Sequence, residues 1–277
     1  MHLRADHAET HIPTLRKLIR DNPLGVFTTA IPSQSYPLIQ SSHIPFLLDV
    51  DDETSTTELG RLRGHMAKQN PQSRAIMESL APPTGADPDV TVLEQEVLVL
   101  FTSPVQHYVT PHFYTTTKPV TGKVVPTWNY AAAQAYGRAR IYCDSSSNSN
   151  ATARFLTTQI SDLSDYCETA VMGYSPSSSS SSSSPGAAEV KDEGKGAAWT
   201  LEQAPERYVE LLRKNIIGLE IEIDRLEGKF KMSQEMVPGD NRGVIDGFRG
   251  LGSVEAGRMA EVVEARWEIK QAAKKAK

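Results

Sequence analysis

Leu59-Gly-Arg-Leu-Arg-Gly-His-Met-Ala-Lys-Gln-Asn-Pro71 changes its pattern of side chains part-way along. The first half, up to His65, predicts a β-strand. Asn70 is a favourable N-cap and Pro71 a favourable first helical residue, so we expect a helix to begin at Pro71 and turn Ile76 inward. The stretch therefore predicts a strand that passes directly into a helix.

The start of this helix is a candidate anion site. The first N–H groups of a helix lack intrahelical partners, and the helix dipole is positive at that end. Lys68 adds a positive charge, His65 can donate a hydrogen bond, and Asn70 can either cap the helix or bind. A single phosphate suits this set. The structural alternative has equal weight: Asn70 and Pro71 only start a helix, and Lys68 is solvated.

Val125-Pro-Thr-Trp-Asn-Tyr130 combines aromatic rings with hydrogen-bonding side chains. A planar ligand ring needs apolar or aromatic faces and a few polar groups at its rim. Thr127 and Asn129 are candidates for that rim. The alternative, which the pattern alone favours, makes Trp128 and Tyr130 core aromatics and leaves Thr127 and Asn129 satisfied in a turn.

Two further polar groups are weaker candidates. Ser42 and His43 interrupt an apolar stretch, and a buried polar group without a partner costs about 1–3 kcal/mol. A ligand or a neighbouring strand would satisfy them, and for His43 the neighbouring strand is the favoured explanation. Lys231-Met-Ser-Gln-Glu235 places a second cation near a turn and indicates little by itself.

The remaining pattern predicts an α+β fold that is mostly β. We expect strands at 25–30, 38–48, 59–65, 96–102, 108–109, 128–143 and 217–223, and helices at 12–20, 154–167, 205–215 and 253–277. Gly137 indicates a bulge or a close backbone approach within its strand. We divide the chain into a first domain part at 1–174, a serine-rich disordered insertion at 175–198, the completion of the same domain at 199–250 and a terminal helix at 251–277.

Composition excludes several classes of protein. The 277 residues carry a formal net charge of -5, so we do not expect direct DNA binding. Cys143 and Cys167 lack the spacing of a disulfide scaffold or a metal site. No apolar run is long enough to span a membrane, and the polar start does not resemble a signal peptide. A cytoplasmic protein is expected, with the nucleus as the alternative.

Six stretches in order resemble the PaiB family. They are Ser42-His-Ile-Pro45, Gly64-His-Met-Ala-Lys-Gln-Asn-Pro-Gln72, the loop with Pro104, Tyr108, Pro111 and Tyr114, Val125-Pro-Thr-Trp-Asn-Tyr130, Tyr136-Gly137 and Lys231-Met-Ser-Gln234. The resemblance covers most of residues 1–250 outside the serine-rich tract. The tract and a proline-rich loop look like eukaryotic, fungal-type elaborations.

The resemblance implies an FMN-binding split β-barrel of the pyridoxamine-phosphate-oxidase type, with flanking helices. Such barrels are homodimers that hold FMN at the subunit interface. His65 to Lys68 resembles the stretch that holds the flavin phosphate, and Trp128 and Asn129 would lie near the flavin, from the second subunit as one option. The expected cofactor-binding residues, with no metal ligand among them, are Ser42, His43, His65, Met66, Ala67, Lys68, Asn70, Thr127, Trp128, Asn129, Tyr130, Lys231 and Gln234.

Three positions depart from the family pattern. Ser73 stands where the family usually has Trp, Gln134 where it often has His, and Glu235 where it often has Asn. The loss of an aromatic ring and a His near the groove would weaken flavin binding or change what stacks on the ring.

Three functions follow from the resemblance and the motifs. The first is a flavin-dependent oxidoreductase that acts on a small molecule, in which FMN carries the chemistry and no catalytic residue is assigned. The second is a transcriptional repressor or regulatory protein. The third is a barrel without cofactor, or one that binds haem through His65 or His43.

Overall fold

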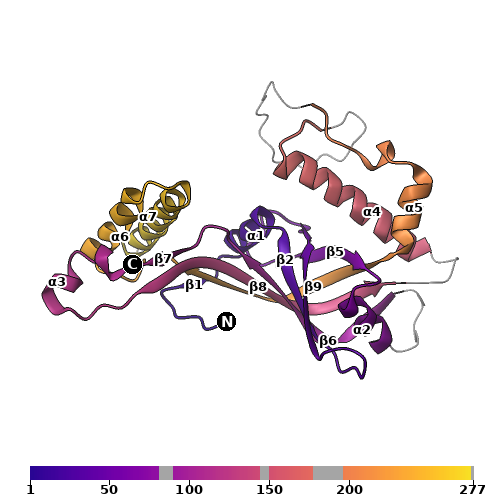
Figure 1. Cartoon of the computed structure of the whole chain (residues 1–277), viewed down its shortest axis with the longest axis horizontal. Coiled ribbons are helices and arrows are strands. Elements are labelled where there is room, and N and C mark those ends of the chain that lie inside the picture. Colours follow the sequence, from indigo (N-terminus) through magenta and orange to yellow (C-terminus); the bar gives the residue numbers. More distant parts are fainter. Residues whose placement is uncertain (81–89, 144–149, 177–195, 276–277) are drawn as a thin grey trace.

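The computed structural model describes residues 1–80, 90–143, 150–176 and 196–275. The molecule is elongated: a curled sheet forms the body, and a group of helices lies at the far end of the long axis (Figure 1). Strands β8 (Thr127–Tyr142) and β9 (Ile216–Lys231) extend from the body to these helices. We call the extension beyond the body the arm.

Antiparallel strands form the sheet in the order β3-β2-β6-β8-β9-β5-β4. In addition to β8 and β9, the strands are β2 (Leu24–Ala30), β3 (Ile39–Pro45), β4 (Leu47–Asp49), β5 (Arg61–Ala67) and β6 (Val90–Thr102). The short strands β1 (Ala8–Glu9) and β7 (His107–Val109) pair with β9 and β8.

The two edges of this sheet meet, which makes it a split barrel. Strands β3 and β4 lie at opposite ends of the strand order, yet only Phe46 separates them in sequence. The single strand that we expected at 38–48 is therefore two strands. The break has a physical cause: Phe46 is buried between Phe27 and Phe101, with ring centroids 6.4 and 6.2 Å away, and β4 turns to pair with β5 instead of β2.

The described part of the chain contains seven α-helices, of which α3, α6 and α7 lie at the far end of the arm (Figure 1). They are α1 (Ile12–Asp21), α2 (Pro71–Ser79), α3 (Thr117–Thr121), α4 (Asn150–Tyr166), α5 (Glu206–Lys214), α6 (Pro238–Gly250) and α7 (Val254–Lys275). Single turns η1 (Pro111–Phe113), η2 (Cys167–Val171) and η3 (Leu201–Gln203) complete the set. None of these helices is both long and apolar enough to cross a membrane.

Helix α6 was not expected from the sequence, because glycine disfavours helices. Its glycines allow another segment to lie directly on the helix. A Cβ atom on Gly243 would lie 2.1 Å from the carbonyl oxygen of Phe113, and one on Gly247 would lie 2.3 Å from the Phe113 ring. The buried Asp240 accepts hydrogen bonds from the N–H groups of Thr116 and Thr117 and so holds this segment in place.

The alternation of apolar residues at 217–223 correctly predicted a strand. Strand β9 is longer than expected and pairs with β8 on one side and β5 on the other. Residues that follow the serine-rich tract thus supply a central strand of the same sheet. Most of the predicted insertion, residues 177–195, lies outside the described residues.

Gly137 lies at the expected irregularity in β8, where the register to β9 shifts between Tyr136 and Gly137. A Cβ atom at Gly137 would lie 1.9 Å from the carbonyl oxygen of Glu222.

We expect Gly137→Ala to lower the free energy of unfolding by about 3 kcal/mol or more, because two central strands must separate. Urea denaturation measures this. Gly257→Ala is the control, since nothing lies within 4 Å of its Cβ position, and it should leave stability unchanged or higher.

Candidate cofactor site

Strand β5 and helix α2 meet as the sequence predicts, and the strand turns successive side chains to opposite faces. Met66 is buried in the core, whereas His65 and Ala67 lie on the outer face. Ser42 and His43 on β3 are separated in the same way: Ser42 faces α2, and His43 is exposed. Met66 can therefore contribute only its backbone to a ligand on the outer face. The side chains of Ser42 and His43 point to opposite faces of the sheet, so they cannot both contact a ligand that lies on one face.

Asn70 fixes the start of α2. Its Oδ1 accepts the N–H of Gln72 at 2.9 Å, and its Nδ2 donates to Ser42 Oγ at 2.9 Å. Both ends of the amide are thus used within the chain. Asn70 caps the helix and ties it to β3, so it positions the anion site.

His65 and Lys68 are the candidate binding groups that lack partners within the described chain. His65 Nδ1 is buried and has no hydrogen-bond partner among the described residues. Burial lowers the pKa of His65, so the ring is neutral near pH 7 and retains one N–H donor. The Lys68 side chain is half-buried and makes no ion pair with any residue that the structure describes. An orphaned imidazole nitrogen, an unpaired cation and a helix start together fit a phosphate.

Helices α4 and α5 enclose this region from the outer side. The N–H of Lys68 donates to the carbonyl oxygen of Asn215, the C-cap residue of α5, at 2.8 Å. Gln159 of α4 donates to the carbonyl oxygen of Arg63 at 3.3 Å. Sequence reasoning missed Asn215, because a backbone carbonyl contact leaves no signal in residue types.

The second group of predicted residues lies on the arm. Trp128 is 49% exposed, so it is not a core aromatic. Its Nε1 donates to Gln106 Oε1 at 3.2 Å, and its ring meets Tyr108 edge-on with centroids 6.3 Å apart. Together with the exposed Val125, these two rings form a surface that we call the aromatic end (Tyr108, Val125 and Trp128).

The other residues of this group have partners within the chain. Lys231 Nζ donates to Thr127 Oγ1, and the Lys229 ammonium lies 5.5 Å from the Tyr130 ring centroid. These contacts leave the side chains half-buried at the surface of the arm. Thr127, Tyr130 and Lys231 therefore remain accessible to a ligand or to a second chain.

The side-chain amides of Asn129 and Gln234 form hydrogen bonds within the arm. Asn129 is fully buried and exchanges two hydrogen bonds with Ser233 Oγ, at 3.0 and 3.1 Å. Gln234 Oε1 accepts the N–H of Met232 at 2.6 Å, and its Nε2 donates to the carbonyl oxygen of Asp6 at 2.9 Å. Because Ser233 has a positive φ of 57°, these amides hold a strained turn. Within one chain both amides have a structural role.

The two groups do not meet within one chain. His65 pairs with Gly218, which pairs with Tyr142 on β8, and Trp128 precedes Tyr142 by fourteen positions along the same strand. At about 3.3 Å per residue, roughly 45 Å of β8 separates the two groups along the strand, which is much longer than one flavin mononucleotide. The sequence could not show this, because it does not contain the register between β5, β9 and β8.

The three positions that depart from the family pattern differ in their surroundings. Ser73 is fully buried on the inner side of α2, so this position faces the core and not a groove. Gln134 is half-buried and accepts a hydrogen bond from the Tyr136 hydroxyl at 3.0 Å. Glu235 lies between the end of β9 and the start of α6, and its Oε2 lies 3.0 Å from Nε2 of the buried His7.

Tyr114 lies near this last pair and is also buried. Burial raises the pKa of Tyr114 to about 12, and the carboxylates of Glu235 and Asp240 add to the shift. The phenol therefore stays protonated near pH 7 and cannot serve as a general base. It stabilises the arm by a hydrogen bond to the carbonyl oxygen of Val125.

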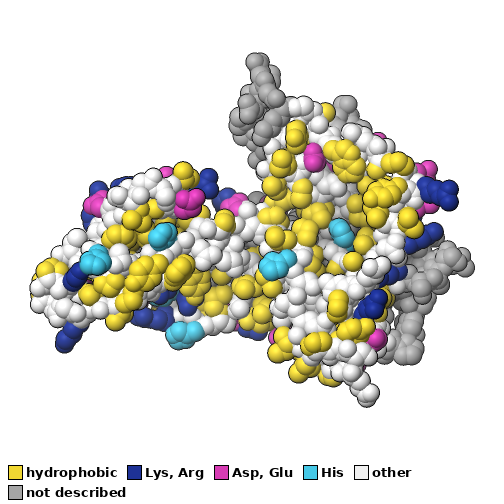
Figure 2. Space-filling model, in the orientation of Figure 1, with side chains coloured by type: hydrophobic (Ala, Val, Ile, Leu, Met, Phe, Trp, Pro, Cys, Tyr) yellow, Lys and Arg dark blue, Asp and Glu magenta, His cyan; other side chains and the backbone are white. Residues whose placement is uncertain are grey.

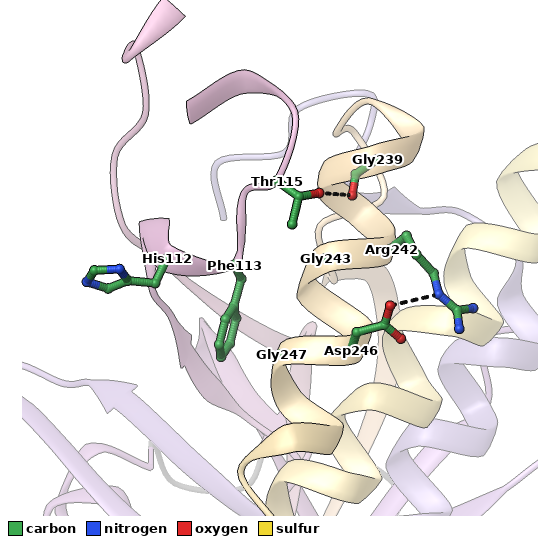
Figure 3. A pocket seen from close by; sticks show the side chains of 8 residues that line it. All are labelled: His112, Phe113, Thr115, Gly239, Arg242, Gly243, Asp246 and Gly247. Carbon is green, nitrogen blue, oxygen red and sulfur yellow. Dashed lines mark hydrogen bonds and ion pairs between the residues drawn. The ribbon is translucent and has the colours of Figure 1, made fainter. Parts of the chain in front are cut away.

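A groove of about 430 Å³ lies elsewhere, between the segment after β7 and helix α6 (Figure 3). Its walls are His112, Phe113, Thr115, Gly239, Arg242, Gly243, Asp246 and Gly247. Thr115 donates to the carbonyl oxygen of Gly239, and Arg242 pairs with Asp246 at 3.0 Å. None of the predicted cofactor residues lines this groove.

Comparison with protein families identifies the chain's relatives. Residues 1–225 match the family described as "Putative FMN-binding domain". The chain belongs to this FMN-binding family. FMN is thus the cofactor of its family, and the candidate anion-binding groups at the β5–α2 junction are consistent with that ligand.

Curated relatives include two fungal proteins and one bacterial protein. The chain is 53% identical to an uncharacterized protein of Aspergillus fumigatus and 56% identical to one of Emericella nidulans, each over 98% of this chain and 99% of the relative. It is 22% identical over 92% of both chains to the "Protease synthase and sporulation protein PAI 2" of Bacillus subtilis. The last match confirms the PaiB resemblance.

Solved structures include the FAD and heme binding protein of Mycobacterium smegmatis. The match has 13% identity and a TM-score of 0.41, and it covers 81% of this chain and 73% of that chain.

Proposed function

We propose that this protein is a homodimeric FMN-binding flavoprotein in which each cofactor site is shared between two chains. The observation that supports sharing is the distance between the two groups of residues. His65 and Lys68 lie at one end of the sheet, and Trp128 lies at the other, on an exposed surface. A second chain would bring its own Trp128 to the Lys68 of the first.

The residues have distinct roles in this proposal. Lys68 neutralises the phosphate, His65 donates a hydrogen bond to it, and the start of α2 adds its positive dipole. Asn70 keeps α2 attached to β3 through Ser42. Trp128 of the second chain covers the ring and excludes water from one of its faces.

Oxidoreductase activity on a small molecule is the reaction class we propose. When bound, FMN supplies hydride and electron transfer, and the protein binds and orients it. The protein then needs no nucleophile or acid–base pair of its own near the cofactor. The exposed His43 and half-buried Gln134 lie on the same outer face as His65 and are candidates for substrate contacts.

Absorption of the purified protein tests the cofactor. We expect the two-banded spectrum of a flavin, and release of FMN on denaturation at one molecule per chain. A sharp Soret band would instead indicate haem, and a colourless protein that does not take up added FMN would contradict the proposal.

A further inference from the structure

Helix α5 carries its apolar side chains on the outside. Tyr208, Leu211 and Leu212 are 55%, 58% and 47% exposed, and their spacing places them on one face of the helix. The opposite face carries Arg213, whose guanidinium donates to Thr157 Oγ1 of α4 at 2.7 Å. A surface helix normally buries its apolar face, so this face lacks its partner within the described part of the chain.

This α5 face (Tyr208, Leu211 and Leu212) borders the proposed cofactor site. The carbonyl oxygen of Asn215, at the end of α5, accepts the N–H of Lys68 at 2.8 Å. Any chain that covers the cofactor beside Lys68 therefore lies next to α5. The contact links the exposed helix to the phosphate-binding loop through one residue.

A second uncovered apolar surface lies at the other end of the molecule. The aromatic end exposes 43% of Tyr108, 74% of Val125 and 49% of Trp128. Figure 2 shows apolar side chains in a band along the arm and again over α4 and α5. The arm and α5 lie at opposite ends of the long axis (Figure 1).

We infer that the α5 face of one copy packs against the aromatic end of a second copy. This inference rests on the proposed shared site and names the surface that completes it. Around a two-fold axis this contact forms twice: the α5 face of each copy covers the aromatic end of the other. Neither surface is left exposed, and the assembly closes as a dimer. The same contact brings Trp128 of one copy beside Lys68 of the other.

The exposed area is sufficient for such a dimer. The six side chains of the two surfaces expose on the order of 600 Å² in each copy, by their exposed fractions and usual side-chain areas. A standard interface buries about 800 Å² per partner, of which roughly 500 Å² is apolar. The two surfaces thus supply the apolar part of a stable interface without other contacts.

Photo-cross-linking tests the contact directly. Leu211→p-benzoylphenylalanine is placed in an isotope-labelled copy, which is mixed with an unlabelled copy and irradiated. We expect a cross-linked dimer whose linked peptide contains residues 104–130 of the other copy. Lys17→p-benzoylphenylalanine on α1 is the control and should give no such product. Cross-links from position 211 to residues 177–195 of its own chain, or to other peptides, would overturn the inference.

A substitution on the exposed face gives an independent readout. Leu211→Glu should weaken dimerisation at least tenfold in sedimentation experiments and leave the melting temperature of the monomer unchanged. Bound FMN should fall at low protein concentration and return at high concentration. If the expected cross-linked dimer forms but does not bind added FMN, the α5 contact stands and the shared cofactor site is refuted. If the protein is a dimer that binds FMN, and Leu211→Glu does not weaken dimerisation, only the α5 contact is refuted.

Discussion

Lys68→Glu is expected to lose FMN binding while the barrel stays folded. The substitution removes a cation of the β5–α2 junction that has no ion-pair partner among the described residues, and it places a negative charge beside the phosphate. A charge-assisted hydrogen bond contributes about 1.5–3 kcal/mol, and charge reversal adds repulsion, so affinity should fall by about 100-fold or more. Titration of the apoprotein with FMN, followed by flavin fluorescence, measures the change.

Lys274→Glu near the end of α7 is the matched control. Lys274 is exposed, and the same change in net charge there should leave FMN affinity unchanged. The Lys68 variant should keep its melting temperature without FMN, because the Lys68 side chain makes no hydrogen bond or ion pair with any described residue. Wild-type affinity in Lys68→Glu would show that the phosphate binds elsewhere.

A mixture of Lys68→Glu and Trp128→Ala chains should recover the high-affinity FMN binding that neither variant shows alone. Trp128→Ala removes the indole ring that stacks on the flavin. Loss of such stacking between a planar ring and an aromatic side chain weakens binding by about 1–3 kcal/mol. In a mixed dimer, one site combines Lys68 from one chain with Trp128 from the other and is intact, while the second site lacks both. Random reassociation should therefore restore about a quarter of the sites.

The control for this experiment is a mixture of Lys68→Glu with the double variant Lys68→Glu/Trp128→Ala. No combination of these chains contains an intact site, so no recovery is expected. Equilibrium dialysis against FMN after co-refolding counts the sites. Two results would refute the shared site: mixed dimers that form without recovering FMN, and Trp128→Ala chains that bind FMN normally by themselves.

The local elements of the fold could be predicted where one physical signal acts over a short stretch. Asn70 and Pro71 predicted the start of α2, and alternating apolar residues predicted β9. Gly137 predicted the bulge, because only glycine permits so close an approach to Glu222. Helix α6 was missed because its glycines, unfavourable for an isolated helix, serve a contact with Phe113 that is far away in sequence.

The candidate site could be predicted only in part. Residue types pointed to His65 and Lys68 as candidate anion-binding groups, since charge and hydrogen-bonding capacity belong to the side chain itself. They could not show that the Asn129 amide forms hydrogen bonds with the Ser233 hydroxyl, or that the carbonyl oxygen of Asn215 accepts the N–H of Lys68. Those contacts join residues more than one hundred positions apart, and no local pattern records them.

The sequence by itself determined the family, the strand-to-helix junction and the alternation that divides each strand into an inner and an outer face. Only the tertiary structure decided that Lys68 and Trp128 lie at opposite ends of one sheet and that α5 turns its apolar face outward. The physical reason is that side-chain periodicity specifies which face a residue occupies, whereas strand register and helix docking specify what it faces.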